Sequence, residues 1–151
     1  MKILADRQIP CVHRVFSEFG EVILRDGRDI TPREARGADV LLVRSITRVD
    51  ADLLAGSAVR FVASATSGID HVDTDYLQQA GIGFASAPGC NAQAVVEYVL
   101  SSLLVLAAQN EFKLTDKVVG IIGCGQVGSR LARVLSAMGV QCLCNDPPLK
   151  E

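Results

Sequence analysis

Short apolar runs recur at regular intervals through the first part of the chain, separated by segments of helical composition. Asp73 is placed to cap one of these helices and Gly81 to end it. Strands that alternate with helices predict an α/β fold with a parallel sheet covered on both faces. The predicted strands are Lys2–Ala5, Glu21–Leu24, Val40–Arg44, Phe61–Ala65 and Gly83–Ser86. The predicted helices are Cys11–Phe19, Pro32–Ala35, Asp50–Ala55 and Thr74–Ala80.

The pattern changes at residues 87–91, where a Pro-Gly pair breaks the preceding strand. The apolar stretch Ala92–Ala108 follows and predicts one long helix. Its polar residues Gln93 and Glu97 and its length fall short of a membrane span, so we expect a buried helix. Polar residues 109–117 then predict a loop. A β-α-β unit follows, with strand Val118–Ile122, a helix from about Gln126 to Met138 and strand Gln141–Asn145.

We place a domain boundary near residue 90. Residues 1–90 form the first α/β domain, and residues 91–151 contain the single β-α-β unit with its preceding helix. One such unit is the first part of a Rossmann dinucleotide-binding domain. We therefore expect the second domain to be incomplete within these residues.

Composition narrows the class of protein. Hydrophobic residues make up 49% of the chain and charged residues 21%, which is typical of a globular protein with a core. The net charge of −2, without a basic cluster, does not favour a nucleic-acid partner. Asp6 comes too early for a secretory signal peptide. We expect a cytoplasmic protein that binds neither nucleic acid nor membrane.

The five cysteines do not form a metal-binding pattern. They are scattered, and only Cys142 and Cys144 are close, on one face of a predicted strand. The two histidines of the chain lie near no cysteine pair. We therefore expect no zinc site and interpret the cysteines as free thiols in a reducing compartment.

A glycine-rich turn follows the strand Val118–Ile122. Gly123, Gly125 and Gly128 match the pattern G-x-G-x-x-G between a strand and a helix. The first glycine permits the tight turn, the second lets a pyrophosphate approach the backbone, and the third lets the helix pack on the strand. The N–H groups of Gln126 and Val127, at the amino end of the helix, would bind the phosphates.

Asp146 strengthens the interpretation of this turn as a nucleotide site. It lies 18 residues after Gly128, at the end of the next strand. The carboxylate that binds the adenosine ribose hydroxyls follows the turn by about 20 residues, and it repels a 2′-phosphate. We therefore predict NAD in preference to NADP. The simpler alternative is a connecting turn with a surface acid.

Two loops at strand ends could bind a substrate. Arg44 and Ser45 follow an apolar run and precede Thr47, so a guanidinium and two hydroxyls could bind a carboxylate or phosphate. Taken alone, this segment fits an exposed arginine with loop-forming neighbours better. Thr66 begins the second loop, in which Gly68 would let N–H groups converge on an anion.

The second loop also contains His71 between Asp70 and Asp73. A catalytic His–Asp pair is one interpretation of this sequence. Asp73 is better explained as a helix cap and Asp70 as a loop former, so we expect His71 to be structural. Glu97 could be a buried catalytic acid, but a single polar residue at a domain boundary explains it more simply.

Together these segments resemble the D-2-hydroxyacid dehydrogenase family. The resemblance rests on residues 68–73 (Gly-Ile-Asp-His-Val-Asp), on residues 88–91 (Pro-Gly-Cys-Asn) leading into 95–100, and on the glycine turn. More narrowly, residues 43–47, 86–92 and 146–148 are similar to a branch of the family that acts on a phosphorylated hydroxy acid. The resemblance extends along the whole chain.

The resemblance implies NAD-dependent oxidation of the 2-hydroxyl of a small phosphorylated hydroxy acid. Residues 1–90 would be a flavodoxin-like substrate domain, with substrate contacts from Ser45 and Thr66 and a charged contact from Arg44. Asp146 and the glycine turn would bind NAD. It also implies that the catalytic Arg, Glu and His, and a carboxy-terminal dimerisation region, lie outside this chain. We therefore expect no catalytic residue here, no activity from the chain alone, and a homodimer of the full-length protein.

Three alternatives remain open. The chain could belong to a relative that acts on phosphoglycerate, glycerate or a simple 2-hydroxy acid. It could be a non-catalytic binding module that responds to NAD and contacts a protein partner. It could also be an inert truncation product. Comparing turnover on phosphorylated and plain hydroxy acids distinguishes the first alternative from the reaction described above. Nucleotide binding without turnover would identify the second.

Overall fold

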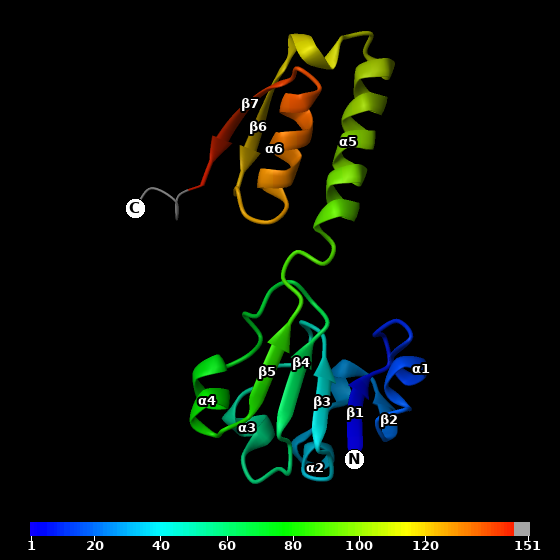
Figure 1. Ribbon diagram of the computed structural model, residues 1–151, viewed down its shortest axis with the longest axis vertical. Coiled ribbons are helices and arrows are strands. Elements are labelled where there is room, and N and C mark those ends of the chain that lie inside the picture. Colours follow the sequence, from blue (N-terminus) through cyan, green and yellow to red (C-terminus); the bar gives the residue numbers. More distant parts are fainter. Residues whose placement is uncertain (147–151) are drawn as a thin grey trace. The chain divides into compact units, whose positions relative to one another are not determined.

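The computed structural model describes residues 1–146 and divides into two compact units. The first is Met1–Pro88, and the second begins at Gly89. Both are built from parallel strands joined by helices (Figure 1).

The first unit contains one five-stranded parallel sheet. Its strand order is β2-β1-β3-β4-β5, so the chain starts near the middle of the sheet and reverses direction between β1 and β3. This is the flavodoxin-like order of doubly wound folds, as predicted. The strands are β1 (Lys2–Asp6), β2 (Glu21–Arg25), β3 (Val40–Val43), β4 (Phe61–Ser64) and β5 (Gly83–Ser86).

The helices of the first unit are short. They are α1 (Val12–Phe16), α2 (Pro32–Ala35), α3 (Ala51–Leu54) and α4 (Thr74–Gln79), with a 3-10 turn η1 (Gly27–Asp29). The predicted cap of α4 is confirmed, because the Asp73 side chain accepts a hydrogen bond from Tyr76 N at 2.9 Å. The predicted helix Cys11–Phe19 is too long. Cys11 has a φ of 58°, in the left-handed region, and the helix begins only after it.

Alternation along the strands divides the core of the first unit between the two faces of its sheet. Leu4, Leu41 and Val62 lie in register across β1, β3 and β4 and are 0–1% exposed. They belong to the larger apolar cluster, which also contains buried residues of α2, α3 and α4. Ile3 and Leu42, on the opposite face, belong to a smaller cluster with Val12 and Phe16 of α1. Helices therefore pack on both faces of this sheet.

The second unit is one β-α-β unit preceded by a long helix. Its elements are α5 (Ala92–Gln109), η2 (Leu114–Asp116), β6 (Val118–Ile122), α6 (Gly128–Ala137) and β7 (Gln141–Asn145). The strands β6 and β7 are parallel, and Leu131 and Leu135 of α6 pack with Ile121 of β6 and Val96 of α5. The predicted strands are confirmed residue for residue, whereas α6 begins two residues later than predicted.

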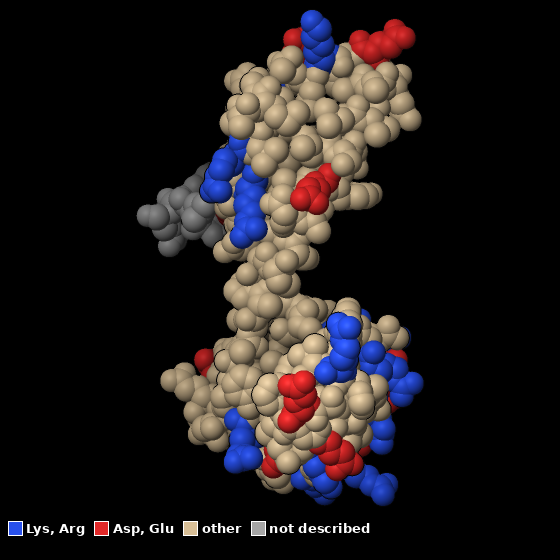
Figure 2. Space-filling model, turned by 45° about the vertical axis from the view of Figure 1, so that its right-hand side comes forward, with Lys and Arg blue, Asp and Glu red and all other residues tan. Residues whose placement is uncertain are grey.

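The prediction that Ala92–Ala108 is a buried helix is wrong for the described residues. Only Ala92, Val96 and Ala107 of α5 are buried, whereas Tyr98 is 75% exposed and Val105 54%. The reason is that α6 and η2 cover only one side of the helix. The face of the second unit visible in Figure 2 accordingly shows few charged side chains. The helix α5 is long and apolar enough to cross a membrane, but helices in protein cores often have the same length and composition.

Candidate functional site

The first candidate site lies at the carboxyl ends of the strands in the first unit. In open α/β sheets, ligands bind outside these ends, at the point where the strand order reverses. Here that point lies between β1 and β3, which are neighbours in the sheet. Asp6 ends β1 and Arg44 follows β3, so both residues stand at the position where the fold favours a ligand.

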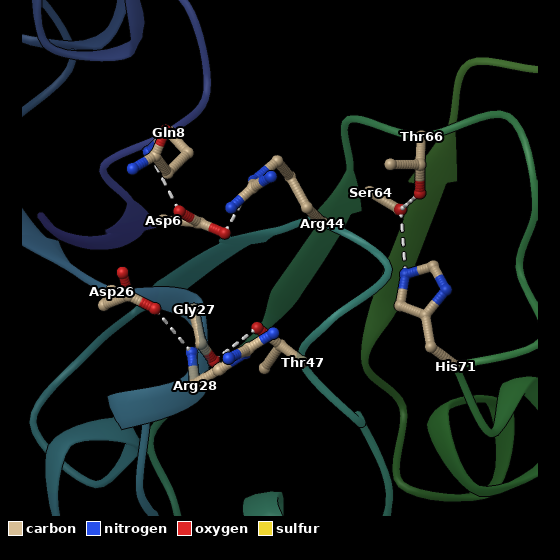
Figure 3. Close-up of polar contacts among 10 residues, drawn as sticks. All are labelled: Asp6, Gln8, Asp26, Gly27, Arg28, Arg44, Thr47, Ser64, Thr66 and His71. Carbon is tan, nitrogen blue, oxygen red and sulfur yellow. Dashed lines mark hydrogen bonds and ion pairs between the residues drawn. The ribbon is translucent and has the colours of Figure 1, made fainter.

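Asp6 and Arg44 form an ion pair at this point (Figure 3). Arg44 Nε lies 2.8 Å from Asp6 Oδ2, and the other carboxylate oxygen accepts a hydrogen bond from Gln8 N at 2.9 Å. The Asp6 side chain is fully buried, whereas that of Arg44 is 30% exposed. A buried carboxylate needs such partners because its desolvation is costly. The ion pair is made by Nε and not by the two terminal guanidinium nitrogens of Arg44.

A second contact fixes the loop that carries Arg44. The Thr47 hydroxyl donates to Gly27 O in η1 at 2.7 Å, and Thr47 is 4% exposed. A Cβ on Gly27 would overlap the Asp6 carboxylate, so the turn, the ion pair and the loop pack closely. Of the two hydroxyls that could bind an anion here, that of Thr47 therefore donates inside the protein instead.

An open hollow of about 500 Å³ brings the other predicted substrate contacts together. Ser45 and Thr66 both line it, although they follow different strands. Gly68, Asp70 and His71 complete its lining. Arg44 is adjacent to Ser45 in the chain but does not line the hollow itself. The structure thus gathers Ser45 and Thr66 in one place, and their role as substrate contacts stays a prediction.

Hydrogen bonds connect Thr66 to the interior of the unit. Ser64 Oγ lies 2.9 Å from Thr66 Oγ1 and 3.0 Å from His71 Nε2 (Figure 3). Thr66 Oγ1 also donates to Gly68 O at 3.4 Å. Ser64 is 4% exposed. Burial lowers the pKa of His71, and the Asp70 carboxylate opposes this only in part, so the imidazole is neutral at pH 7.

Sequence reasoning did not identify Ser64 or Asp6 as site residues. Ser64 shares a strand face with fully buried Val62, since side chains two residues apart on a strand point the same way. A serine at an inward-facing position just before a loop could therefore have identified Ser64 from the sequence as a site residue. Asp6 directly follows the apolar run of β1, but only the strand order reveals its partner.

The second candidate site is the glycine turn between β6 and α6. Gly123 has a φ of 89°, which side chains rarely adopt, as expected for the tight turn. A Cβ on Gly128 would overlap the carbonyl oxygen of Gly123, so only glycine lets α6 approach β6 this closely. A Cβ on Gly125, by contrast, would meet no described atom within 4 Å. This open space lies where a pyrophosphate would approach the backbone.

The amino end of α6 offers backbone donors beside that space. Ser129 N donates to Gly125 O at 3.1 Å and Leu131 N to Val127 O at 2.9 Å, which are the first helical hydrogen bonds. The N–H groups of Gln126 and Val127 lie just before them, Val127 being the cap residue of the helix, where N–H groups have no partner within the helix. Such groups can bind an anion, and the binding of a phosphate by Gln126 and Val127 stays a prediction.

Asp146 is held against the glycine turn. Its Oδ2 accepts a hydrogen bond from Cys124 N at 2.6 Å, and Gly123 N donates to Asn145 O at 2.8 Å. Desolvation raises the pKa of the Cys124 thiol, and the Cys144 thiol and the Asp146 carboxylate raise it further. The thiol is therefore neutral beside the acid. Pro147 and Pro148, which entered the resemblance, lie outside the described residues.

Glu97 does not behave as a buried catalytic acid. It lies on an exposed part of α5, and Gln93 Nε2 donates to its Oε1 at 2.9 Å, one helical turn away. This is an ordinary surface pair along a helix.

Sequence comparison identifies relatives of this chain. The sequence model of the "D-isomer specific 2-hydroxyacid dehydrogenase, catalytic domain" family matches residues 3–139. The erythronate-4-phosphate dehydrogenase of Chromohalobacter salexigens is 57% identical over 151 residues, all of this chain. That of Cronobacter sakazakii is 56% identical over 148 residues. The chain spans 39% of the length of each of these two proteins.

Solved structures agree with this assignment of the fold. The NAD⁺-bound 3-phosphoglycerate dehydrogenase of Entamoeba histolytica matches with a TM-score of 0.74 at 25% identity, covering 100% of this chain and 55% of that one. The D-lactate dehydrogenase of Aquifex aeolicus, in complex with NAD and lactic acid, gives 0.76 at 20% identity, covering 95% and 50%. The second likeness shows the fold alone. From the family match over residues 3–139, the chain belongs to the D-isomer specific 2-hydroxyacid dehydrogenase family.

Proposed function

We propose that this chain supplies the substrate unit and the start of the NAD unit of an erythronate-4-phosphate dehydrogenase. The reaction would be NAD-dependent oxidation of the 2-hydroxyl of 4-phospho-D-erythronate to the 2-oxo-4-phospho acid. The observation that carries the proposal is the attachment of Asp146 to the glycine turn through Cys124 N. It joins the acid expected to bind ribose to the backbone expected to bind phosphate, in a chain 57% identical to a relative of that name.

The second unit fits NAD in three respects. The backbone at Gly125 is open to a pyrophosphate, and the N–H groups of Gln126 and Val127 stand beside it. Asp146 would accept hydrogen bonds from the adenosine ribose hydroxyls, and its negative charge would repel the 2′-phosphate of NADP. When bound, the nicotinamide accepts a hydride. These residues of the chain would bind and orient the cofactor.

The first unit would bind the substrate through its strand-end loops. Ser45 and Thr66 line one hollow and would donate hydrogen bonds to anionic oxygens. The terminal nitrogens of Arg44 would add a positive charge for the phosphate or carboxylate, while Asp6 holds its Nε. Proton transfer from the 2-hydroxyl needs a base held close to the substrate. We place that base, and the Arg and Glu that accompany it, in residues beyond this chain.

The rest of the proposal concerns the whole protein. We place it in the cytoplasm as a homodimer, in the pathway to pyridoxal phosphate. Purified protein from the complete native gene should reduce NAD with 4-phospho-D-erythronate, with hydrazine present to trap the 2-oxo product. D-erythronate and D-3-phosphoglycerate serve as comparison substrates. Faster turnover on either of these would replace erythronate-4-phosphate dehydrogenase by another member of the family.

A second candidate function has one observation in its favour. The exposed side of α5 is apolar, with Tyr98, Val105 and Leu106 from 49% to 75% exposed, as a surface for a protein partner would be. A non-catalytic module that responds to NAD would use such a surface. NAD binding by the complete protein, without turnover of any 2-hydroxy acid, would establish this candidate and end the first.

A further inference from the structure

Three side chains at the end of β4 form a hydrogen-bonded chain that the proposed function does not yet use. His71 Nε2, Ser64 Oγ and Thr66 Oγ1 lie 3.0 and 2.9 Å apart in succession (Figure 3). Thr66 Oγ1 lies 3.4 Å from Gly68 O. Ser64 is the middle member and is 4% exposed. Both ends of this series of hydrogen bonds, His71 and Thr66, therefore line the same hollow, and only its middle member lies in the interior.

The donor and acceptor in each of these hydrogen bonds can be assigned by starting from the carbonyl oxygen of Gly68. Gly68 O is a carbonyl oxygen and can only accept, so the Thr66 hydroxyl donates to it. A hydroxyl has one proton to donate, so Thr66 Oγ1 must accept the hydrogen bond that the Ser64 hydroxyl donates. By the same argument Ser64 Oγ accepts from His71 Nε2–H. The lowered pKa of His71 agrees with a neutral ring, which carries a single proton.

The last hydrogen bond of the chain is its weakest. At 3.4 Å the Thr66–Gly68 contact is well beyond the usual distance for a hydroxyl donor. An anionic oxygen in the hollow could replace Gly68 O as the acceptor of the Thr66 hydrogen bond, because little interaction energy would be lost. The two inner hydrogen bonds would stay in place. Asp70 also lines the hollow and repels anions, so charge alone does not favour an anion there. A fixed donor therefore matters more for binding.

We propose that Ser64 and His71 are positioning residues that hold the Thr66 hydroxyl as a fixed donor to an anionic oxygen of the substrate. This inference rests on the proposed function, because it assigns Thr66 to the same substrate. Because Thr66 Oγ1 accepts from Ser64, its own O–H points away from Ser64 and stays a donor. The Thr66 hydroxyl is thus oriented when the protein folds, so substrate binding does not lose free energy in orienting it.

The first experiment compares KM and kcat in the protein from the complete native gene, with NAD and 4-phospho-D-erythronate. Ser64→Ala should raise KM roughly 3- to 10-fold, the value of one hydrogen bond, with kcat changed by less than about 2-fold. Ser86→Ala is the matched control, since Ser86 pairs with Ser64 in the neighbouring strand. An unchanged KM in Ser64→Ala would overturn the inference.

Variants of His71 and Thr66 distinguish a role in positioning the Thr66 hydroxyl from a role only in stabilising the fold. His71→Leu should raise KM as Ser64→Ala does, whereas His71→Gln should restore it, because the amide N–H can donate in place of Nε2–H. Thr66→Val should raise KM, and adding Ser64→Ala to it should cause no further rise, since both act through one hydroxyl. Additive effects in the double variant would contradict the inference.

A measurement without turnover distinguishes failure of the inference from failure of the proposed function. Nitrogen NMR of the His71 ring should show the proton on Nε2 in the free protein, and a proton on Nδ1 alone would overturn the inference. A native protein that binds 4-phospho-D-erythronate but does not oxidise it would end the proposed function. In that case the inference requires binding to weaken in Ser64→Ala by the same roughly 3- to 10-fold.

Discussion

The two candidate sites are built from different parts of the polypeptide. In the first unit, side chains make the site, as in the Asp6–Arg44 pair and the hydroxyls that line the hollow. In the second unit, the backbone makes it, through a glycine turn and the first N–H groups of α6. Asp146 is the side chain that completes the second site.

This difference determines which kind of change each site can tolerate. A site made of backbone is sensitive to an added Cβ where elements touch, as at Gly128, and where a ligand would approach, as at Gly125. It is insensitive where open space lies away from the turn, as at Gly120. A site made of side chains is sensitive to loss of a single charge or hydroxyl. Each of the following predictions changes one of these features.

The largest effect is expected from Gly128→Ala. The new Cβ would overlap the Gly123 carbonyl, which is backbone and cannot move aside, so α6 must shift from β6. We expect the second unit to lose about 3 kcal/mol of unfolding free energy or more, together with NAD binding. Urea unfolding followed by circular dichroism and NAD titration measure the two effects.

Two further glycine variants test the same point. Gly120→Ala adds a Cβ into open space within β6 and should change neither stability nor NAD affinity. Gly125→Ala also meets no described atom, but it should weaken NAD binding because the pyrophosphate needs that space. If Gly128→Ala were as stable as Gly120→Ala, the close approach of α6 to β6 would be refuted.

A smaller loss of stability is expected from Asp6→Asn. The change keeps the shape of the side chain and the acceptor for Gln8 N but removes the charge that faces Arg44. We expect a loss of about 2 kcal/mol, because Arg44 is partly exposed and water can compensate in part. Substrate affinity should fall too, since Arg44 loses its orientation. Asp39→Asn, which alters an exposed pair with Arg60, is the control and should cost little.

Asp146→Asn should affect the cofactor rather than the fold. An asparagine oxygen can still accept from Cys124 N, so the turn should remain intact. The loss of charge should weaken NAD binding roughly 10-fold, which corresponds to one charged hydrogen bond. NADP should then bind better relative to NAD, because its 2′-phosphate is no longer repelled. Equal loss of affinity for both nucleotides would show that the charge does not select between them.

The smallest effect concerns acid stability of the first unit. Burial lowers the pKa of His71 in the fold, so the unfolded chain binds its proton more readily as the pH falls below 6.5. The unfolding free energy should therefore be constant above this pH and decrease below it, by less than about 1.4 kcal/mol per pH unit. Asp70 faces the ring, and Arg48, Asp50 and Asp73 line the adjoining hollow.

A comparison with His71→Gln isolates the contribution of this residue. The variant should lose the part of the acid dependence that arises from His71 and keep the rest. Urea unfolding at several pH values between 5 and 8 provides the measurement. Identical pH dependence in the two proteins would exclude a lowered pKa for His71.

Most of the fold could be predicted from the sequence, because its elements are local. Period-two and apolar runs identified every strand to within one residue, and Asp73 capped its helix as predicted. The prediction for α5 failed because apolar composition does not show which faces neighbouring elements cover. Ile122 and Leu143, 87% and 62% exposed on the two-stranded sheet, illustrate the same point.

The sequence by itself determined the glycine turn. Gly123, Gly125 and Gly128 are close in the chain, and each is required or permitted by local backbone geometry. The tertiary structure alone decided the partners at the strand ends. Arg44 contacts Asp6 across 38 residues, and it does so because β3 pairs with β1 rather than with β2. Strand order depends on how whole helices and strands bury their apolar faces, which no short segment of sequence specifies.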